Sequence, residues 1–163
     1  MELNQTQLSF VNRINSTVYF KLFSIFKLPL AFITGLKIIE FNTEQCVTSV
    51  RLKYLNKNPF SSIYFAVLAM AAELSTGTFA LLASQKTEPG LLLIVTSIRA
   101  DFIKKATGHI QFRCQDGNKA FEAVQKTIET SESKMQTLKT VGFNEDGEIV
   151  AEFEFTWSFK VID

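Results

Sequence analysis

At 163 residues, the chain is long enough to form one domain that buries a hydrophobic core of its own. Its 17 basic and 16 acidic residues are mixed along the sequence and leave a net charge of +1, which excludes the basic footprint of a nucleic-acid-binding protein. A hydrophobic content of 47% excludes a disordered chain, and the 16 phenylalanines indicate a large apolar interior, a buried subunit interface or a pocket for an apolar ligand.

The two cysteines, Cys46 and Cys114, are far apart in the sequence and lack the spacing of metal ligands. Both fall in strand-like segments, where a free thiol behaves as a small buried hydrophobic group. The N-terminus lacks the pattern of a signal peptide. We therefore expect reduced cysteines, a cytoplasmic protein, and neither a metal site nor a cofactor.

The segment from Leu8 to Phe32 carries apolar residues at helical spacing and few charges. This pattern predicts one or two N-terminal helices, broken at Pro29, that pack across a sheet. A membrane-surface role is the weaker alternative, because the polar face of the segment carries only Arg13, Lys21 and Lys27.

Two strand-like runs follow Gly35, namely Leu36 to Phe41 and Cys46 to Leu55, joined by a polar turn over residues 42–45. In the second run, apolar and polar residues alternate as far as Tyr54. The alternation predicts a half-buried strand.

A segment that is hydrophobic on every side runs from Ile63 to Gln85, and Glu73 is its only charged residue. Ser61 and Ser62 precede it and are good N-caps for a helix. Its length would suit a bilayer span, but the polar residues within it and the strands after it favour a core helix surrounded by other elements.

The next run, Leu91 to Ile103, begins as a continuous apolar stretch and predicts a long central strand. Residues 109–115 alternate in polarity and predict another strand. Apolar residues recur at helical spacing from Asn118 to Ser131, which predicts an amphipathic helix on the surface.

Two closing strands are predicted over Lys134 to Phe143 and Glu148 to Ile162, joined by a hairpin turn that contains Asp146-Gly147. One face of the last strand carries seven apolar residues, namely Ile149, Ala151, Phe153, Phe155, Trp157, Phe159 and Val161. So aromatic a face needs a cover, and the helix over residues 63–85 is the obvious one. The pattern predicts an α+β fold in which an antiparallel sheet wraps a long central helix.

Residues Asn58 to Leu68, continuing through Ala71 to Leu74, resemble a branch of single-hotdog proteins in the hotdog superfamily of acyl-CoA thioesterases. That branch has Asn, often His, a small residue, then Tyr-Phe-Gly-Ala-Leu and an acidic residue further along the helix. Phe102 to Gly108 is similar to a strand ending that usually reads Lys-Pro-Ala. The resemblance implies a hotdog fold over one domain, residues 1–163, with an N-terminal helical segment (1–34) packed alongside the hotdog core (35–163).

Three positions depart from the pattern of the branch. Pro59 stands where the branch often has His, Ala66 where it has Gly, and Lys105 where it has Pro. Pro59 has no N–H to donate, and the methyl group of Ala66 occupies space where a substrate would approach the backbone closely. These departures bear on catalysis and leave the predicted fold unchanged.

A lone carboxylate on a buried helix loses hydration, which raises its pKa unless a cation pairs with it. The resemblance implies that Glu73 is the catalytic general base or nucleophile and that Thr76 orients it or a water molecule. It also implies that N–H groups at the helix start hold the carbonyl oxygen of a thioester. The implied substrate-binding residues are Asn58, Ser61, Ser62, Ile63, Tyr64, Phe65, Ala66 and Lys104.

A structural interpretation of the same residues stands beside the catalytic one. Glu73 would then pair with Lys53 or Arg51, and Thr76 would bond back to its own helix. Lys104 would be a solvated residue at a strand end rather than a ligand for the phosphates of coenzyme A. His109, the only histidine, lies on a polar strand face and has no partner in a catalytic motif.

Three functions remain open from the sequence. The first is hydrolysis of an acyl-CoA or acyl-carrier thioester, the second is non-catalytic binding of fatty-acyl groups, and the third is a structural domain whose phenylalanine surface binds another protein. We expect a homodimer, or a dimer of dimers, because a single hotdog leaves its site half built and one strand edge open. No nucleic-acid partner and no membrane span are expected.

Overall fold

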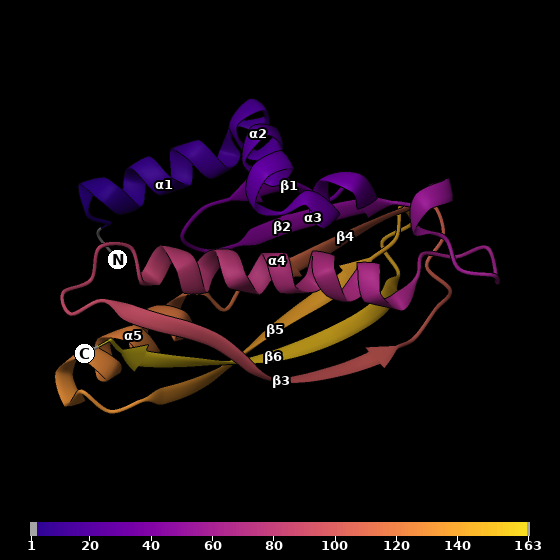
Figure 1. Cartoon of the computed structure of the whole chain (residues 1–163). Helices are drawn as coiled ribbons and strands as arrows, with labels where there is room; N and C mark the ends of the chain where they lie inside the picture. Colours follow the sequence, from indigo (N-terminus) through magenta and orange to yellow (C-terminus); the bar gives the residue numbers. More distant parts are fainter. Residues whose placement is uncertain (1–2, 163) are drawn as a thin grey trace.

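The computed structural model describes residues 3–162, which form five α-helices, one short 3-10 helix and a six-stranded sheet. In chain order the elements are α1 (Gln5–Asn15), α2 (Thr17–Lys27), α3 (Pro29–Thr34), β1 (Lys37–Phe41), β2 (Cys46–Arg51), η1 (Tyr54–Asn56), α4 (Phe65–Ala83), β3 (Leu91–Phe102), β4 (His109–Cys114), α5 (Gly117–Thr130), β5 (Lys134–Phe143) and β6 (Ile149–Val161). The sheet is antiparallel throughout and curves around α4 (Figure 1).

The N-terminal segment forms three helices rather than the one or two predicted. Ser16 ends α1 and also caps α2, where its hydroxyl accepts a hydrogen bond from the Tyr19 N–H. The predicted break at Pro29 is confirmed, because Leu28 separates α2 from α3 and Pro29 opens α3. Gly35 ends the segment with a φ of +76°, a left-handed conformation that glycine adopts without strain.

Strand β2 is shorter and more deeply buried than the sequence predicts. It ends at Arg51, and Tyr54 lies exposed in η1 instead of extending the strand. The strand lies between β1 and β4, and residues on both of its faces are buried. Thr48 donates a hydrogen bond of 2.6 Å to the carbonyl oxygen of Ala71, which ties β2 to α4.

Helix α4 is the core helix that the sequence predicts. It begins at Phe65 with Tyr64 as its N-cap, so the prediction that Ser61 or Ser62 caps it is wrong. Within residues 3–162 it is the one helix long and apolar enough to cross a membrane, and most of that stretch is buried against the rest of the protein. A core helix passes the same test, and the sheet wrapped around α4 gives it that place.

The strand order is β1-β2-β4-β5-β6-β3, so β3 lies at an edge of the sheet and the prediction of a central strand is wrong. Its apolar run resembles a buried strand, yet Leu92, Ile94, Ile98 and Phe102 are all exposed. A bulge between Val95 and Ser97 shifts the register against β6, so that alternate residues change face part of the way along the strand.

The remaining strands follow their predicted alternation. Ile110, Phe112 and Cys114 of β4 are buried, and so is the aromatic face of β6 from Ala151 to Phe159. The hairpin between β5 and β6 turns at Gly147, which has a φ of +78°. Six phenylalanines, one from α4 and five from the sheet, fill the core with almost no exposed surface, namely Phe79 and then Phe41, Phe112, Phe153, Phe155 and Phe159.

Both cysteines are buried and free, and they are direct neighbours in the sheet. Cys46 of β2 is the register partner of Cys114 of β4. Burial raises the pKa of the Cys46 thiol and raises the pKa of Cys114 to about 12, so both remain protonated thiols at neutral pH.

Candidate functional site

Glu73 lies on α4 and lines a cavity of about 330 Å³ between this helix and the corner where α2 meets α3. The other lining residues are mostly apolar, namely Lys27, Leu28, Pro29, Leu30, Ala31, Leu36, Met70 and Leu74. The sequence identified Glu73 but not this wall, which comes from a segment far away in the chain. The only signal for the wall was the run of apolar residues around Pro29.

The Glu73 carboxylate occupies the space above Gly77, one turn further along α4. A Cβ atom at Gly77 would lie 2.8 Å from Glu73 Oε1 and 3.2 Å from the ring of Trp157. Any side chain at position 77 would therefore displace the carboxylate or the indole. Glycine provides the room for the carboxylate inside the fold.

Burial raises the pKa of Glu73, because loss of hydration disfavours the charged form. Among the residues that the structure describes, no cation forms an ion pair with this carboxylate. A raised pKa brings a carboxylate closer to the pKa that suits a general base near neutral pH.

Neither Lys53 nor Arg51 forms the predicted ion pair with Glu73. Arg51 pairs with Glu145 at 3.4 Å on the surface. The Lys53 ammonium lies over Gly35, 2.6 Å from where a Cβ atom would be. Arg51 is the last residue of β2 and Lys53 follows the strand, and both residues are exposed to solvent.

Thr76 uses its hydroxyl to join α4 to the sheet. It donates to the carbonyl oxygen of Glu73 at 3.0 Å and accepts from Trp157 Nε1 at 3.2 Å, and the residue is buried. The hydroxyl thus contacts the main chain of Glu73 and not its carboxylate, as the structural interpretation proposes. A catalytic role for Thr76 stays a prediction.

Asn58 organises the loop that leads into α4. Its Oδ1 accepts hydrogen bonds from the N–H groups of Phe60 and Ser62, at 3.0 and 3.1 Å, and from the Ser62 hydroxyl at 3.1 Å. Ser61 adopts a left-handed φ of +57° at the tip of this loop. The side chains of Asn58 and Ser62 therefore hold the loop in place, and a role in substrate binding stays a prediction for all three residues.

The structure narrows the predicted oxyanion donors to two. The Ile63 N–H donates to the carbonyl oxygen of Ala106 and the Tyr64 N–H to that of Asn56. Within residues 3–162, the N–H groups of Phe65 and Ala66 have no acceptor, as expected in the first turn of a helix. These two donors lie at the positive end of the helix dipole.

The helix start and Glu73 are too far apart to act on one carbonyl group within a single chain. Eight residues separate Phe65 from Glu73, which corresponds to about 12 Å along the helix axis at 1.5 Å per residue. A catalytic base has to lie within about 3 Å of the atom from which it takes a proton, or one water molecule away.

Neither Lys104 nor His109 lines the Glu73 cavity. Lys104 forms an ion pair with Glu148 at the end of β3, and this pair lowers the pKa of Glu148. A role of Lys104 in binding phosphate stays a prediction. His109 of β4 is the register partner of Arg51 of β2. Within the described residues, no carboxylate or hydroxyl forms a hydrogen bond with the His109 ring.

Solved structures share this architecture. A Pseudomonas aeruginosa protein described as a probable thioesterase is 17% identical, with a TM-score of 0.75 over 99% of this chain and 100% of that one. A Chlorobaculum tepidum protein of unknown function is 15% identical, with a TM-score of 0.77 over 94% and 99%. A Haemophilus influenzae thioesterase is 13% identical, with a TM-score of 0.65 over 90% and 91%. The predicted hotdog fold is confirmed.

The sequence comparisons point to a single family. A search of the curated proteins finds no match. The family described as a domain of unknown function, DUF4442, matches residues 16–159, which include α2, the residues of the Glu73 cavity and all of the sheet except the last two residues of β6. Because the match extends over most of the chain, this protein belongs to the DUF4442 family.

Proposed function

We propose that the protein hydrolyses an acyl thioester, carried by coenzyme A or an acyl carrier, with Glu73 as general base or nucleophile. The observation that carries this proposal is an unpaired carboxylate of raised pKa in the wall of an apolar cavity. The names of the similar structures from P. aeruginosa and H. influenzae support the same class of reaction.

The cavity suits the acyl part of such a substrate. Leu28, Leu30, Met70 and Leu74 provide apolar walls, and the carboxylate is the one acidic group that lines it. An acyl chain packed there would gain roughly 0.8 kcal/mol for each methylene group removed from water. Its carbonyl carbon would then lie beside Glu73, where the carboxylate or an activated water molecule could attack it.

The carbonyl oxygen needs donors from another part of the protein, because the helix start of the same chain is too distant from Glu73. We propose that a second copy of the chain supplies them through its Phe65 and Ala66 N–H groups. Two features support self-association beside the start of α4. The edge of β3 is open, and Phe65 and Phe102 form a half-exposed aromatic pair beside it, with ring centroids 6.3 Å apart.

The test is the variant Glu73→Gln, which keeps the size of the side chain and removes the proton acceptor. Hydrolysis of a panel of acyl-CoA thioesters of increasing chain length should fall by roughly 100-fold or more. Glu122→Gln is the matched control, because Glu122 also lies on a helix but is exposed on α5. Equal activity of Glu73→Gln and the wild type would overturn the catalytic role of Glu73.

Binding of fatty-acyl groups without hydrolysis is the second candidate, and the methyl group of Ala66 at the helix start favours it. This methyl group stands beside the free N–H donors and hinders close approach of a carbonyl oxygen. A wild type that binds acyl groups and hydrolyses none of the thioesters would establish this function in place of the first. The affinity of Glu73→Gln for acyl groups would then report whether the carboxylate contacts the ligand.

A further inference from the structure

We propose that the outer face of α2 and α3 docks the protein on an anionic membrane surface. This docking face consists of Val18, Leu22, Ile25, Phe26, Leu30 and Ile33. The sequence alone favours packing of this segment onto the sheet. The structure favours a different role, because only Phe20 and Ser24 of α2 are buried and several large apolar side chains of α2 and α3 remain exposed.

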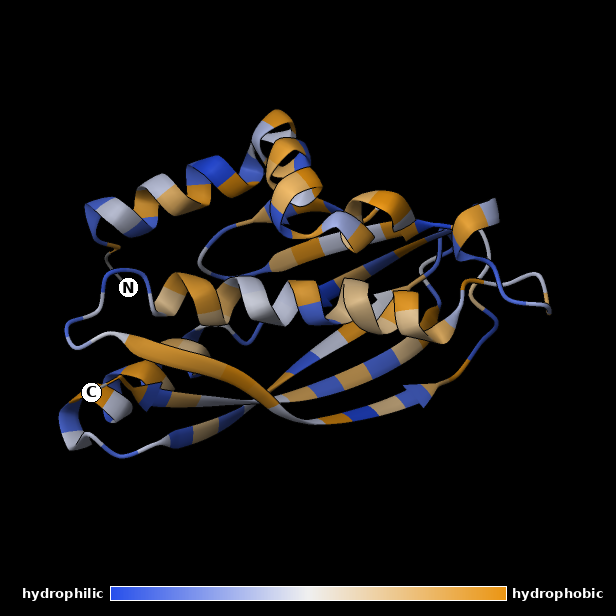
Figure 2. Cartoon of the chain, in the orientation of Figure 1, coloured by the Kyte–Doolittle hydropathy of each residue, from blue (hydrophilic) through white to orange (hydrophobic). Residues whose placement is uncertain are grey.

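The apolar residues of the docking face have no partner within the described chain. Phe20 and Ser24 form the buried side of α2, whereas Val18 and Phe26 are 70% and 78% exposed. Val18, Leu22 and Ile25 follow helical spacing and form a continuous stripe. Figure 2 shows the mainly hydrophobic colours of α2 and α3 on the side of the molecule away from β3. An outward stripe of this kind is typical of helices that lie in a membrane interface.

The charges within the chain segment that forms the docking face all have one sign. Between Glu2 and Glu40 the sequence contains four basic residues, Arg13, Lys21, Lys27 and Lys37, and not one acidic residue. None of these four forms an ion pair within the part of the chain that the structure describes. Although the whole protein is nearly neutral, this region is therefore cationic and attracts anionic lipids.

Three lysines line a groove of about 610 Å³ beside α2. Lys21, Lys37 and Lys53 line it together with apolar residues such as Phe20 and Phe32. Ammonium groups next to aromatic side chains match the phosphate and upper acyl region of a phospholipid, which is polar at one end and apolar at the other.

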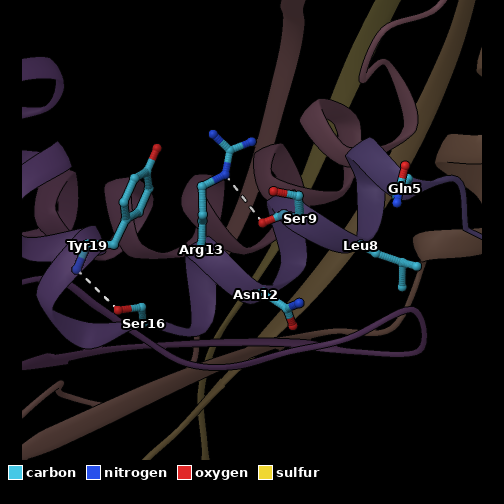
Figure 3. Close-up of a pocket in the computed structure, with 7 residues that line it drawn as sticks. All are labelled: Gln5, Leu8, Ser9, Asn12, Arg13, Ser16 and Tyr19. Carbon is cyan, nitrogen blue, oxygen red and sulfur yellow. Dashed lines mark hydrogen bonds between the residues drawn. The ribbon is translucent and has the colours of Figure 1, made fainter.

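Arg13 and Tyr19 extend the cationic border to the junction of α1 and α2. The Arg13 guanidinium lies 5.9 Å from the centre of the Tyr19 ring, and Figure 3 shows both side chains reaching away from the ribbon on the same side. Tyr19 also stacks on Phe23, with ring centroids 6.3 Å apart. Tyrosine and arginine are common where a protein meets the headgroup region of a membrane.

A second copy of the chain suits this face less well than a membrane. In a symmetric dimer the same patch meets itself, so the cations that border the face would approach their own copies without an acidic residue to compensate. The open edge at β3 already offers a separate surface for self-association. An anionic membrane satisfies both the apolar stripe and the charges.

The Glu73 cavity opens beside the docking face. Leu30 belongs to both the docking face and the cavity wall, and Lys27 and Leu28, which also line the cavity, lie between Phe26 and Leu30 in the sequence. If the proposed hydrolysis is correct, an acyl chain can pass from the membrane into the cavity without crossing bulk water. The docking itself does not depend on that chemistry.

The test is co-sedimentation of the full chain with vesicles of phosphatidylcholine alone or mixed with phosphatidylserine. The wild type should bind the mixed vesicles, and binding should weaken as salt is added. The variant Arg13→Glu/Lys21→Glu should bind at least about 30-fold more weakly, because each basic residue near such a surface contributes roughly fivefold. Val18→Ser/Phe26→Ser should also lose binding, since it removes the apolar contact.

Matched controls separate this face from general effects of charge and hydrophobicity. Lys126→Glu/Lys160→Glu makes the same change in net charge at exposed positions elsewhere, and Met135→Ser removes an apolar side chain that is 68% exposed on β5. Both should bind like the wild type, and circular dichroism confirms that each variant folds. The proposal is overturned if the wild type ignores mixed vesicles, or if the face variants bind them as well as the controls do. It is also overturned if Val18→Ser/Phe26→Ser turns a dimer into a monomer and leaves vesicle binding unchanged.

If the proposed hydrolysis does not occur, the variants give a different set of results from those expected if the membrane docking does not occur. The face variants keep every cavity residue, so their hydrolysis of a short, soluble acyl-CoA thioester in the absence of vesicles should match that of the wild type. Loss of vesicle binding with this activity intact supports the docking face. Absence of hydrolysis in every variant and in the wild type counts against the proposed function and leaves the docking result valid.

Discussion

At the scale of single residues, the position of Glu73 lowers the stability of the folded state. Its carboxylate lies above Gly77, lines an apolar cavity and forms no ion pair within the described residues. Burial raises its pKa, so the folded state prefers the protonated form. An unpaired buried acid is typical of a functional residue rather than of a structural one.

The variant Glu73→Gln should therefore be more stable than the wild type at neutral pH. Because the pKa is raised in the folded state, the stabilising effect of the protonated acid is complete below its unfolded pKa of about 4.3. It is lost as the pH rises through the folded pKa. Thermal unfolding from pH 4 upward should show the two proteins converging at low pH and the variant ahead at high pH. Lower stability of the variant at pH 7 would mean that the carboxylate has a cationic partner after all.

The two cysteines should react slowly with thiol reagents in the native protein. Both are fully buried, and burial raises the pKa of each thiol, which keeps the reactive thiolate scarce. Titration with a chromogenic disulfide should detect two thiols after unfolding and very slow labelling before it. Rapid labelling of both native thiols would contradict the placement of Cys46 and Cys114 in the β2 and β4 pair.

At the scale of elements, one buried side-chain hydrogen bond joins α4 to β6. Trp157 Nε1 donates to the Thr76 hydroxyl in the interior, where water cannot replace the acceptor. The same hydroxyl holds the main chain of Glu73, so this contact also positions the catalytic candidate. Helix α4 thus combines a core role with the role of presenting a carboxylate.

The variant Thr76→Val should lower the free energy of unfolding by about 1–3 kcal/mol, because it leaves the indole N–H without an acceptor at nearly constant volume. Thr137→Val is the control, since its hydroxyl bonds to Thr156 on an exposed part of the sheet. That substitution should change stability by less than about 0.5 kcal/mol. Urea unfolding measures both. A loss of hydrolysis by Thr76→Val without a loss of stability would support a catalytic rather than a structural role.

At the scale of the whole molecule, the sheet ends in an unpaired strand with apolar residues beside it. Leu92, Ile94, Ile98 and Phe102 of β3 are about half exposed, and the backbone groups along the outer edge of this strand are free to pair. The proposed active site requires helix-start donors from another copy. Both the open edge of β3 and the need for donors from another copy favour self-association.

We expect a homodimer that pairs through the β3 edge. Light scattering after gel filtration should give about twice the chain mass of 18.4 kDa at micromolar concentration. The variant Ile94→Asp/Ile98→Asp should dissociate the dimer, because it buries charges at the interface without partners. Val18→Asp/Phe26→Asp, which places two aspartates at exposed positions on α2 on the side of the molecule away from β3, is the control. A monomeric wild type would remove the basis of the two-copy site.

The sequence by itself determined the helices, most of the strands and the catalytic candidate, because each of these follows from the local pattern of apolar and polar residues. Residues that alternate along β6 and β4 have to face one side of a pleated strand, and a helix that is apolar on all sides has to be enclosed. Glu73 was identifiable because it is the only charge in that helix.

Only the tertiary structure decided which elements are neighbours and which apolar surfaces remain uncovered. An apolar run like that of β3 is as typical of a central strand as of an edge strand that pairs with another chain. Cys46 meets Cys114, Lys53 turns toward Gly35 instead of Glu73, and residues 27–36 complete the cavity. These contacts join residues far apart in the chain, so chain topology sets them and no local pattern encodes them.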